Sequence, residues 1–196
     1  ITIPFAQHIK CVTAIEPSKG MGAVLKENAK ELGVENFNII EEMVQDLPQD
    51  GSFDSQFDVV AISLVLWMFP DVWPRILQME QYSKGYCAIV AGIPDWKNPR
   101  AASKSDVEEF QILYNMLLSQ GRFPNVSVID YKCERIVEDE IECRKIIYEQ
   151  YEGDLTSEAE EQIRTEVITR AKDNKCLISS RSAVIWWNPK EIVSPR

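Results

Sequence analysis

Apolar runs and amphipathic stretches alternate along the first part of the chain. Residues 10–17 (KCVTAIEP) and 36–40 (NFNII) are short runs rich in β-branched and aromatic residues, which predicts two strands. Between them, residues 18–33 carry apolar side chains three and four positions apart, as on one face of a helix. Ser18 can cap the start of this helix, and Gly33 can end it. The pattern therefore predicts a strand, a helix and a second strand.

The next segments continue the same alternation. Residues 57–66 (FDVVAISLVL) are so uniformly apolar that we expect a strand covered on both faces, which is typical of a parallel sheet. Residues 71–85 predict a helix that begins at Asp71 and ends at Gly85. A further buried strand is predicted at residues 86–92 (YCAIVAG).

The second half of the chain has longer elements. An amphipathic helix is predicted at 103–121, and a strand with one solvated side at 125–137 (NVSVIDYKCERIV). Two helices follow at 140–151 and 157–172, and the last strand is predicted at 176–187 (CLISSRSAVIWW). These elements predict an α/β fold with a doubly wound, mostly parallel sheet. Its C-terminal edge is antiparallel, and a helical insertion separates the last two strands.

Composition narrows the class of protein. The 196 residues, 45% of them hydrophobic, fit a single domain over 1–196 with a sizeable core. A net charge of −10 and a pI near 4.7 argue against nucleic acid and anionic membranes as partners. Five cysteines in scattered positions form no metal-ligand or redox spacing, so we expect no metal and reduced thiols. No apolar run reaches the roughly 18 residues of a membrane span, and a cytoplasmic protein is expected.

Glu16 stands where the first predicted strand ends. In doubly wound sheets, ligands bind in the crevice outside the carboxyl ends of the strands. A carboxylate at that position can accept two charge-assisted hydrogen bonds from the neighbouring hydroxyls of a ribose. A solvated acid at a strand end is the other interpretation, and the position of Glu16 does not distinguish the two.

A second nucleotide-binding pattern is present in the same region. Gly20 and Gly22 follow a strand, open a helix and precede Glu41 by about twenty residues, as in nicotinamide dinucleotide sites. Leu25 stands where that pattern needs a third small residue, and Pro17 lies within the turn. A nicotinamide-dependent oxidoreductase is therefore an alternative. A catalytically inactive cofactor-binding or regulatory domain is another.

Residues 1–48, followed by 57–69 (FDVVAISLVLWMF), resemble the class I S-adenosylmethionine-dependent methyltransferases. The resemblance is clear to about residue 92, and its marker is an acidic residue that ends a strand and is followed by Ser and Met, as in IEPSKGM. It implies a Rossmann-like fold, S-adenosylmethionine as cofactor and methyl transfer as the activity. It also implies that Glu16 binds the ribose and that Met21 packs near the adenine.

The resemblance assigns further cofactor contacts, with one departure from the family. Many members have an aspartate that accepts from the adenine amino group, but Met43 occupies that position here, and a thioether is a weak acceptor. The adenine is then expected to be held by apolar packing and by backbone groups around Met43 and Val44, with Asp46 more distant. Ser63 and Leu64 are expected to contact the methionine part through their backbone.

The sequence says less about the binding site of the methyl acceptor than about that of the cofactor. Trp67, Met68 and Phe69 follow the strand where the family places donor and acceptor, so they either line the substrate site or belong to the core. The sulfonium methyl needs alignment for in-line displacement more than a general base, so no catalytic residue is assigned. The acidic, apolar composition favours a small-molecule substrate. A second copy of the chain is a candidate partner through the acidic helices.

A second departure concerns the start of the chain. The family's glycine-rich loop and its first strand, which lies in the middle of the sheet, have no counterpart in this sequence. Without that strand, two neighbouring strands each lose a ladder of backbone hydrogen bonds. We therefore expect the domain to be incomplete at its N-terminus, with further residues preceding Ile1 in the native protein.

Overall fold

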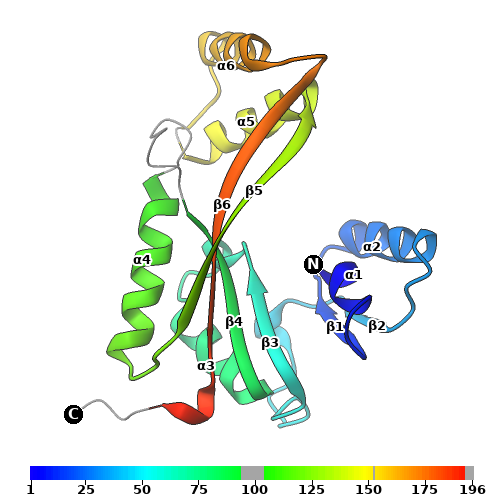
Figure 1. Cartoon of the computed structure of the whole chain (residues 1–196), viewed down its shortest axis with the longest axis vertical. Helices are drawn as coiled ribbons and strands as arrows, with labels where there is room; N and C mark the ends of the chain where they lie inside the picture. Colours follow the sequence, from blue (N-terminus) through cyan, green and yellow to red (C-terminus); the bar gives the residue numbers. More distant parts are fainter. Residues whose placement is uncertain (94–103, 152, 193–196) are drawn as a thin grey trace. The chain divides into compact units, whose positions relative to one another are not determined.

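The computed structural model describes residues 1–93, 104–151 and 153–192. The chain divides into two compact units, Ile1–Gln56 and Phe57–Arg196 (Figure 1). The single domain expected from chain length stays a prediction.

The first unit is a two-stranded parallel sheet with helices. Its elements in chain order are α1 (Thr2–Ala6), β1 (Val12–Ile15), α2 (Lys19–Glu31), β2 (Phe37–Ile40) and the 3-10 turn η1 (Val44–Asp46). β1 and β2 pair in parallel, from Val12 opposite Phe37 to Ile15 opposite Ile40. The strand, helix and strand predicted from the sequence are confirmed.

Local sequence signals set the ends of α2. The Ser18 side chain accepts a hydrogen bond from the Met21 backbone N–H at 3.3 Å, so the predicted N-cap is present. Gly33 adopts a φ of 64°, the left-handed conformation that glycine provides after a helix. A small core of Ala6, Ala29 and Val34 joins the two helices of the unit to its sheet.

The second unit contains a four-stranded sheet and most of the helices. Its elements are β3 (Phe57–Ser63), the 3-10 turn η2 (Leu66–Met68), α3 (Trp73–Tyr82), β4 (Ser83–Ile93), α4 (Lys104–Ser119), β5 (Asn125–Ile136), α5 (Val137–Tyr151), α6 (Ser157–Arg170), β6 (Lys175–Trp187) and the 3-10 turn η3 (Pro189–Glu191). The strand order is β3-β4-β6-β5. β3 and β4 are parallel, whereas β6 is antiparallel to both β4 and β5. The predicted α/β fold with an antiparallel C-terminal edge is confirmed.

The main core lies on one face of this sheet. Cys87, Ile89, Ile185 and Trp187 are at most 2% exposed, and cross-strand pairing places them on the same face. Apolar residues of α3 and α4 cover them: Ile76, Met79, Leu113 and Leu117. Both helices therefore pack on the same side of this sheet, each through the apolar face that its sequence pattern predicted.

Two details of the second unit differ from the sequence-based expectations. β3 is not covered on both faces, because Val59 is 54% exposed and only alternate residues such as Val60 and Ile62 pack on the core. Helix α3 ends at Tyr82, and Gly85 lies within β4 instead of ending the helix. A Cβ atom at Gly85 would lie 2.4 Å from the Asp58 backbone oxygen, so glycine here permits the close approach of β3 to β4.

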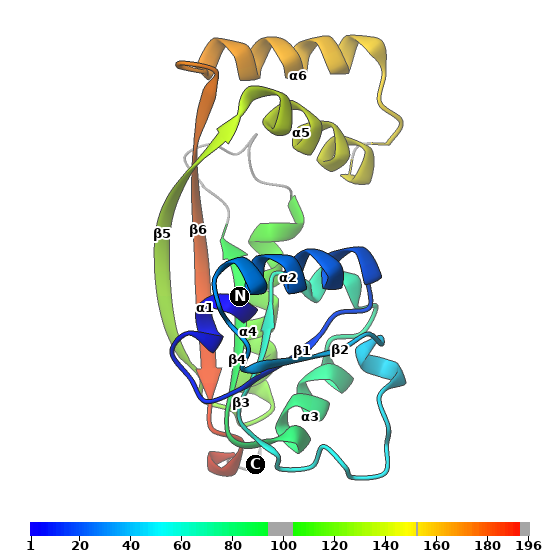
Figure 2. The ribbon, with the colours of Figure 1, turned by 90° about the vertical axis from the view of Figure 1, so that its right-hand side faces the viewer.

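β5 and β6 run side by side as a long hairpin that carries α5 and α6 at one end (Figures 1 and 2). The predicted helical insertion between the last two strands is thus confirmed. The helices have a core of their own, in which Val137, Ile141, Val167 and Cys176 are buried. β5 is exposed along nearly its whole length, so the expectation of one solvated side and one buried side is wrong for this strand. Within the described residues, no helix is long and apolar enough to cross a membrane.

Candidate functional site

Glu16 lies at the carboxyl end of β1, as the sequence predicted. The half-buried Glu16 side chain accepts a hydrogen bond from the Ser18 backbone N–H at 2.9 Å, through its Oε1 atom. This contact fixes the carboxylate beside the start of α2. Among the described residues, Oε2 has no protein donor, so the group retains acceptor capacity for a ligand. Sequence reasoning found Glu16 but missed the orienting role of Ser18.

The start of α2 presents an apolar side chain next to this carboxylate. Met21 lies in the first turn of α2 and is 59% exposed. Gly20 and Gly22 lie within α2 itself, and a Cβ at Gly22 would be 3.7 Å from the Glu41 Oε1 atom. The glycine pattern of a nicotinamide site requires these residues in the turn before the helix, so the arrangement does not support that alternative.

Glu41 is engaged in an ion pair. Its Oε1 atom lies 2.7 Å from the Lys26 Nζ atom on α2. The hydrogen bond and the charge of Lys26 lower the pKa of the Glu41 carboxyl below its usual value. Glu41 therefore joins α2 to the segment after β2 and is not the ribose acceptor that the oxidoreductase alternative needs.

Met43 and Val44 follow β2 at the first 3-10 turn. Met43 is 36% exposed, and its carbonyl accepts a hydrogen bond from the Asp46 N–H at 2.9 Å. Val44 is half-buried, and Asp46 is exposed. The region thus offers an apolar surface rather than a carboxylate at Met43, as the sequence analysis expected.

The carboxyl end of β3, in the second unit, forms a sharp turn. Ser63 is the last residue of the strand and pairs with Val90 of β4. The next residue, Leu64, has a φ of 56° and donates its N–H to the Val90 carbonyl at 2.9 Å. The Leu64 N–H is therefore engaged within the sheet, so a cofactor contact through that particular group is excluded.

The residues after Leu64 divide between core and surface. Leu66 is 3% exposed, and Phe69 is partly buried against the same core. Leu64, Val65 and Met68 are 48%, 37% and 49% exposed. The backbone of Trp67 is part of η2, but its side chain lies outside the described part of the structure. The exposed residues Val65 and Met68 were not separated from their buried neighbours in the sequence, because all are apolar.

In the described parts of the chain, no three His, Cys, Asp or Glu side chains are grouped so that they could hold a metal ion. Burial, with a smaller contribution from Glu80, raises the pKa of the Cys87 thiol to about 12, so this cysteine is neutral at physiological pH. None of the five cysteines forms a disulfide.

Comparison with known proteins agrees with this arrangement. Residues 1–88 match the family model described as a methyltransferase domain. Three similar solved structures are BH2331 from Bacillus halodurans, a proposed methyltransferase (16% identity, TM-score 0.56), YcgJ from Bacillus subtilis (15%, 0.55) and precorrin 8w decarboxylase from Methanobacterium thermoautotrophicum (14%, 0.52). The matches cover 94%, 94% and 95% of this chain and 85%, 84% and 74% of those chains, respectively. No curated protein matches the sequence significantly.

Residues 1–88 therefore carry a methyltransferase-domain sequence, and the fold is that of the class I S-adenosylmethionine-dependent methyltransferases. The methyltransferase resemblance recognised in the sequence is thereby confirmed for residues 1–88, and the expected Rossmann-like fold is confirmed as well. The residues of the first unit fit the adenosine part of S-adenosylmethionine. Glu16 offers an oriented carboxylate oxygen for a ribose, and the exposed side chains of Met21 and Met43 offer apolar surface for an adenine.

Proposed function

We propose that this protein binds S-adenosylmethionine and transfers its methyl group to a small-molecule acceptor. The observation that carries the proposal is the Glu16 carboxylate, held by the Ser18 N–H at the carboxyl end of a parallel strand. Few other side chains can accept from both hydroxyls of a ribose in that position. Met21, Met43 and Val44 would provide the apolar surroundings of the adenine.

By the family resemblance, the end of β3 would also take part in the proposed chemistry. The Ser63 and Leu64 backbone would contact the methionine part of the cofactor, with the Leu64 N–H remaining on Val90. The segment after β3, with its exposed residues Val65 and Met68, would take part in binding the acceptor. When bound, the cofactor supplies an activated sulfonium methyl group, which passes to the acceptor by in-line displacement. The protein residues bind and align the reactants, which can lower the barrier by roughly 7 to 11 kcal/mol.

The charge of the protein favours a small acceptor that carries little or no negative charge. The net charge of −10 repels polyanions such as nucleic acid at long range. The segment 63–70 (SLVLWMFP) contains no charged residue, so an ionic acceptor would find no counter-charge on it. These two features favour a neutral small molecule.

Calorimetric titration with S-adenosylmethionine and with reduced nicotinamide dinucleotide tests the proposal. We expect saturable binding of the first and none of the second. Formation of S-adenosylhomocysteine in the presence of an acceptor library, followed by mass spectrometry, then tests catalysis. Binding of the nicotinamide cofactor would favour the oxidoreductase alternative. Cofactor binding without turnover across the library would favour an inactive cofactor-binding domain.

A further inference from the structure

β5 forms one edge of the four-stranded sheet. It pairs with β6 alone, and Figure 2 shows no other described element of the second unit along its outer side. β5 is 12 residues long, contains no proline or glycine, and pairs with β6 without a bulge. Edge strands are usually protected from further pairing by shortness, proline, bulges or charged side chains, and β5 has only the last of these. The outward N–H and C=O groups of such an edge can pair with another strand.

Apolar side chains are exposed on both faces of β5. Val126 and Val128 lie on one face, and Ile129 and Tyr131 lie on the other, because side chains alternate along a strand. All four are exposed, although Ile185 of the neighbouring strand β6 is fully buried. These side chains add little to the core of a single chain, whereas a further strand along β5 would cover both rows.

The charged residues of β5 leave one cation without a counter-charge. Asp130 forms an ion pair with Arg181 of β6, and Glu134 forms one with Lys175 of β6. Lys132 lies between the two carboxylates on the same face and forms no ion pair with any described residue. A further strand with a carboxylate opposite Lys132 would supply the missing counter-charge.

We propose that this strand is β5 of a second copy of the chain. The two strands run antiparallel about a two-fold axis at Tyr131, so residues at equal distances from Tyr131 lie opposite each other. Asp130 of each copy then faces Lys132 of the other, which gives two ion pairs, and the two Tyr131 rings lie side by side at the axis. The sheets of the two copies become one continuous sheet.

The charge pattern of β5 excludes most other registers. An axis at any charged residue of the strand would place two like charges directly opposite each other, which is destabilising. An axis nearer the start of the strand would leave Lys132 opposite no carboxylate. Among the remaining axes, the one at Tyr131 pairs residues 126–136, whereas an axis at Cys133 pairs only 130–136. The Tyr131 register therefore combines complementary charges with the greatest length of pairing.

Sedimentation of the full-length protein tests association, and an exchange of charges tests the register. We expect a dimer at micromolar concentrations. Lys132→Glu and Asp130→Lys should each weaken association roughly tenfold or more, because two attractive pairs become two repulsive pairs. An equal mixture of the two variants should restore association, since each introduced charge then faces an opposite charge on the other variant. Lys30→Glu, the same charge change on the exposed surface of α2, should associate like the wild type.

Cross-linking locates the axis directly. With the exposed cysteines removed by Cys11→Ser and Cys133→Ser, Tyr131→Cys should form a disulfide-linked dimer in oxidised glutathione, because the two introduced thiols meet at the axis. With Cys11→Ser alone, each Cys133 lies opposite Ile129 of the other copy. The two Cys133 residues are then about 13 Å apart, too far for a disulfide, so this protein should stay dimeric but unlinked.

Four results would overturn the proposal: a full-length protein that stays monomeric, association of Lys132→Glu within twofold of the wild type, a mixture of the charge variants that does not associate, or a disulfide between two Cys133 residues. Association that the charge changes leave intact would place the contact elsewhere, as on the acidic helices α5 and α6. None of these measurements involves S-adenosylmethionine, so their failure is distinct from a failure of the proposed methyl transfer.

Discussion

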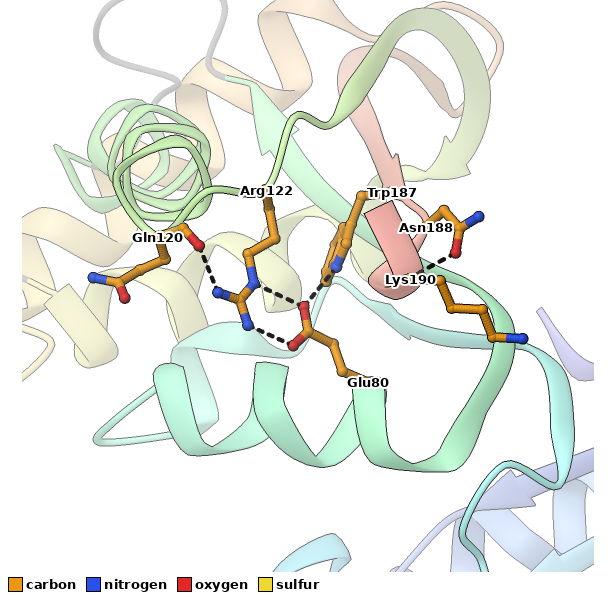
Figure 3. A network of polar contacts seen from close by, with 6 residues as sticks. All are labelled: Glu80, Gln120, Arg122, Trp187, Asn188 and Lys190. Atoms are coloured by element: carbon orange, nitrogen blue, oxygen red, sulfur yellow. Dashed lines mark hydrogen bonds and ion pairs between the residues drawn. The ribbon is translucent and has the colours of Figure 1, made fainter. Parts of the chain in front are cut away.

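Arg122 and Glu80 form a bidentate ion pair inside the second unit. Arg122 Nε lies 3.0 Å from Glu80 Oε1, and Arg122 Nη2 lies 2.7 Å from Glu80 Oε2. Trp187 Nε1 donates to the same carboxylate at 2.8 Å (Figure 3). The Arg122 guanidinium also lies 4.8 Å from the ring centre of Trp73. One carboxylate of α3 thereby connects the segment after α4 with the end of β6.

Removal of either charge should destabilise the fold strongly. Both side chains are about one-tenth exposed, and deletion of one partner of a buried pair costs about 3–5 kcal/mol because the other charge is left without compensation. We expect Arg122→Ala to lower the free energy of unfolding by about that amount in urea denaturation.

The Lys26–Glu41 pair provides the matched control for this prediction. Its N–O distance is also 2.7 Å, but the Lys26 side chain is 58% exposed, so Lys26→Ala should lower the free energy of unfolding much less than Arg122→Ala does. Similar losses in the two variants would show that burial of the Glu80 pair does not govern its contribution.

Glu16→Ala should weaken S-adenosylmethionine binding roughly ten- to hundredfold. Hydrogen bonds to charged groups are worth about 1.5 to 3 kcal/mol, and about 1.4 kcal/mol corresponds to a factor of ten in affinity. Glu16→Gln keeps the shape without the charge, so an intermediate loss is expected. Calorimetric titration measures all three proteins, and Glu31→Gln, on the exposed surface of α2, serves as a control that should bind like the wild type. Equal affinities in the Glu16 series would leave Glu16 as a solvated strand end.

Met43→Asp should tighten cofactor binding or leave it unchanged. The substitution supplies a carboxylate acceptor for the adenine amino group, and at 36% exposure Met43 is not a buried core residue. The dissociation constant for S-adenosylmethionine is the measurement. A loss of more than tenfold without a change in melting temperature would show that the thioether itself packs on the adenine.

The Cys87 thiol should make stability depend on alkaline pH. Its pKa is raised to about 12 in the folded protein, from about 9 for an ordinary thiol. Below pH 9 the thiol is protonated in both the folded and the unfolded state, so its contribution to the free energy of unfolding is fully present. As the pH rises from 9 towards 12, the unfolded chain loses this proton first, and stability falls.

Urea denaturation at pH 8, 9 and 10 checks this prediction. The free energy of unfolding of Cys87→Ala should fall less steeply between pH 8 and 10 than that of the wild type. The variant should nevertheless be less stable at pH 8, because a buried side chain is truncated. The exposed residue Cys133 provides the control. The free energy of unfolding of Cys133→Ala should fall with pH as steeply as that of the wild type. A Cys87→Ala slope equal to that of the wild type would contradict the assignment.

Periodicity in the sequence was sufficient to predict the strands and helices, because each element has its own local pattern. The Ser18 cap follows from that pattern directly. The end of α3 could not be predicted in the same way. Gly85 is read as a helix end from local sequence, whereas its actual role depends on the Asp58 backbone of a neighbouring strand.

The candidate site was predicted in part for a related reason. Glu16 is recognisable because a charge at the end of an apolar run stands out in the sequence. Leu64 and Met68 do not stand out, since they occur in an uninterrupted apolar segment and only the backbone conformation separates them from buried Leu66. The Glu80–Arg122–Trp187 contacts join residues far apart in the chain, which one sequence does not reveal.

The hairpin of β5 and β6 also has a consequence for length variation in this protein. Its register is continuous from Asn125 opposite Trp186 to Ile136 opposite Lys175, so the two strands are still directly paired where α5 begins and α6 has ended. A two-residue Asn-Gly turn could therefore replace residues 137–174 without any change of register, since antiparallel strands need no longer connection. Helices α5 and α6 could therefore be replaced as a unit, and chains of quite different length could share the remaining sheet.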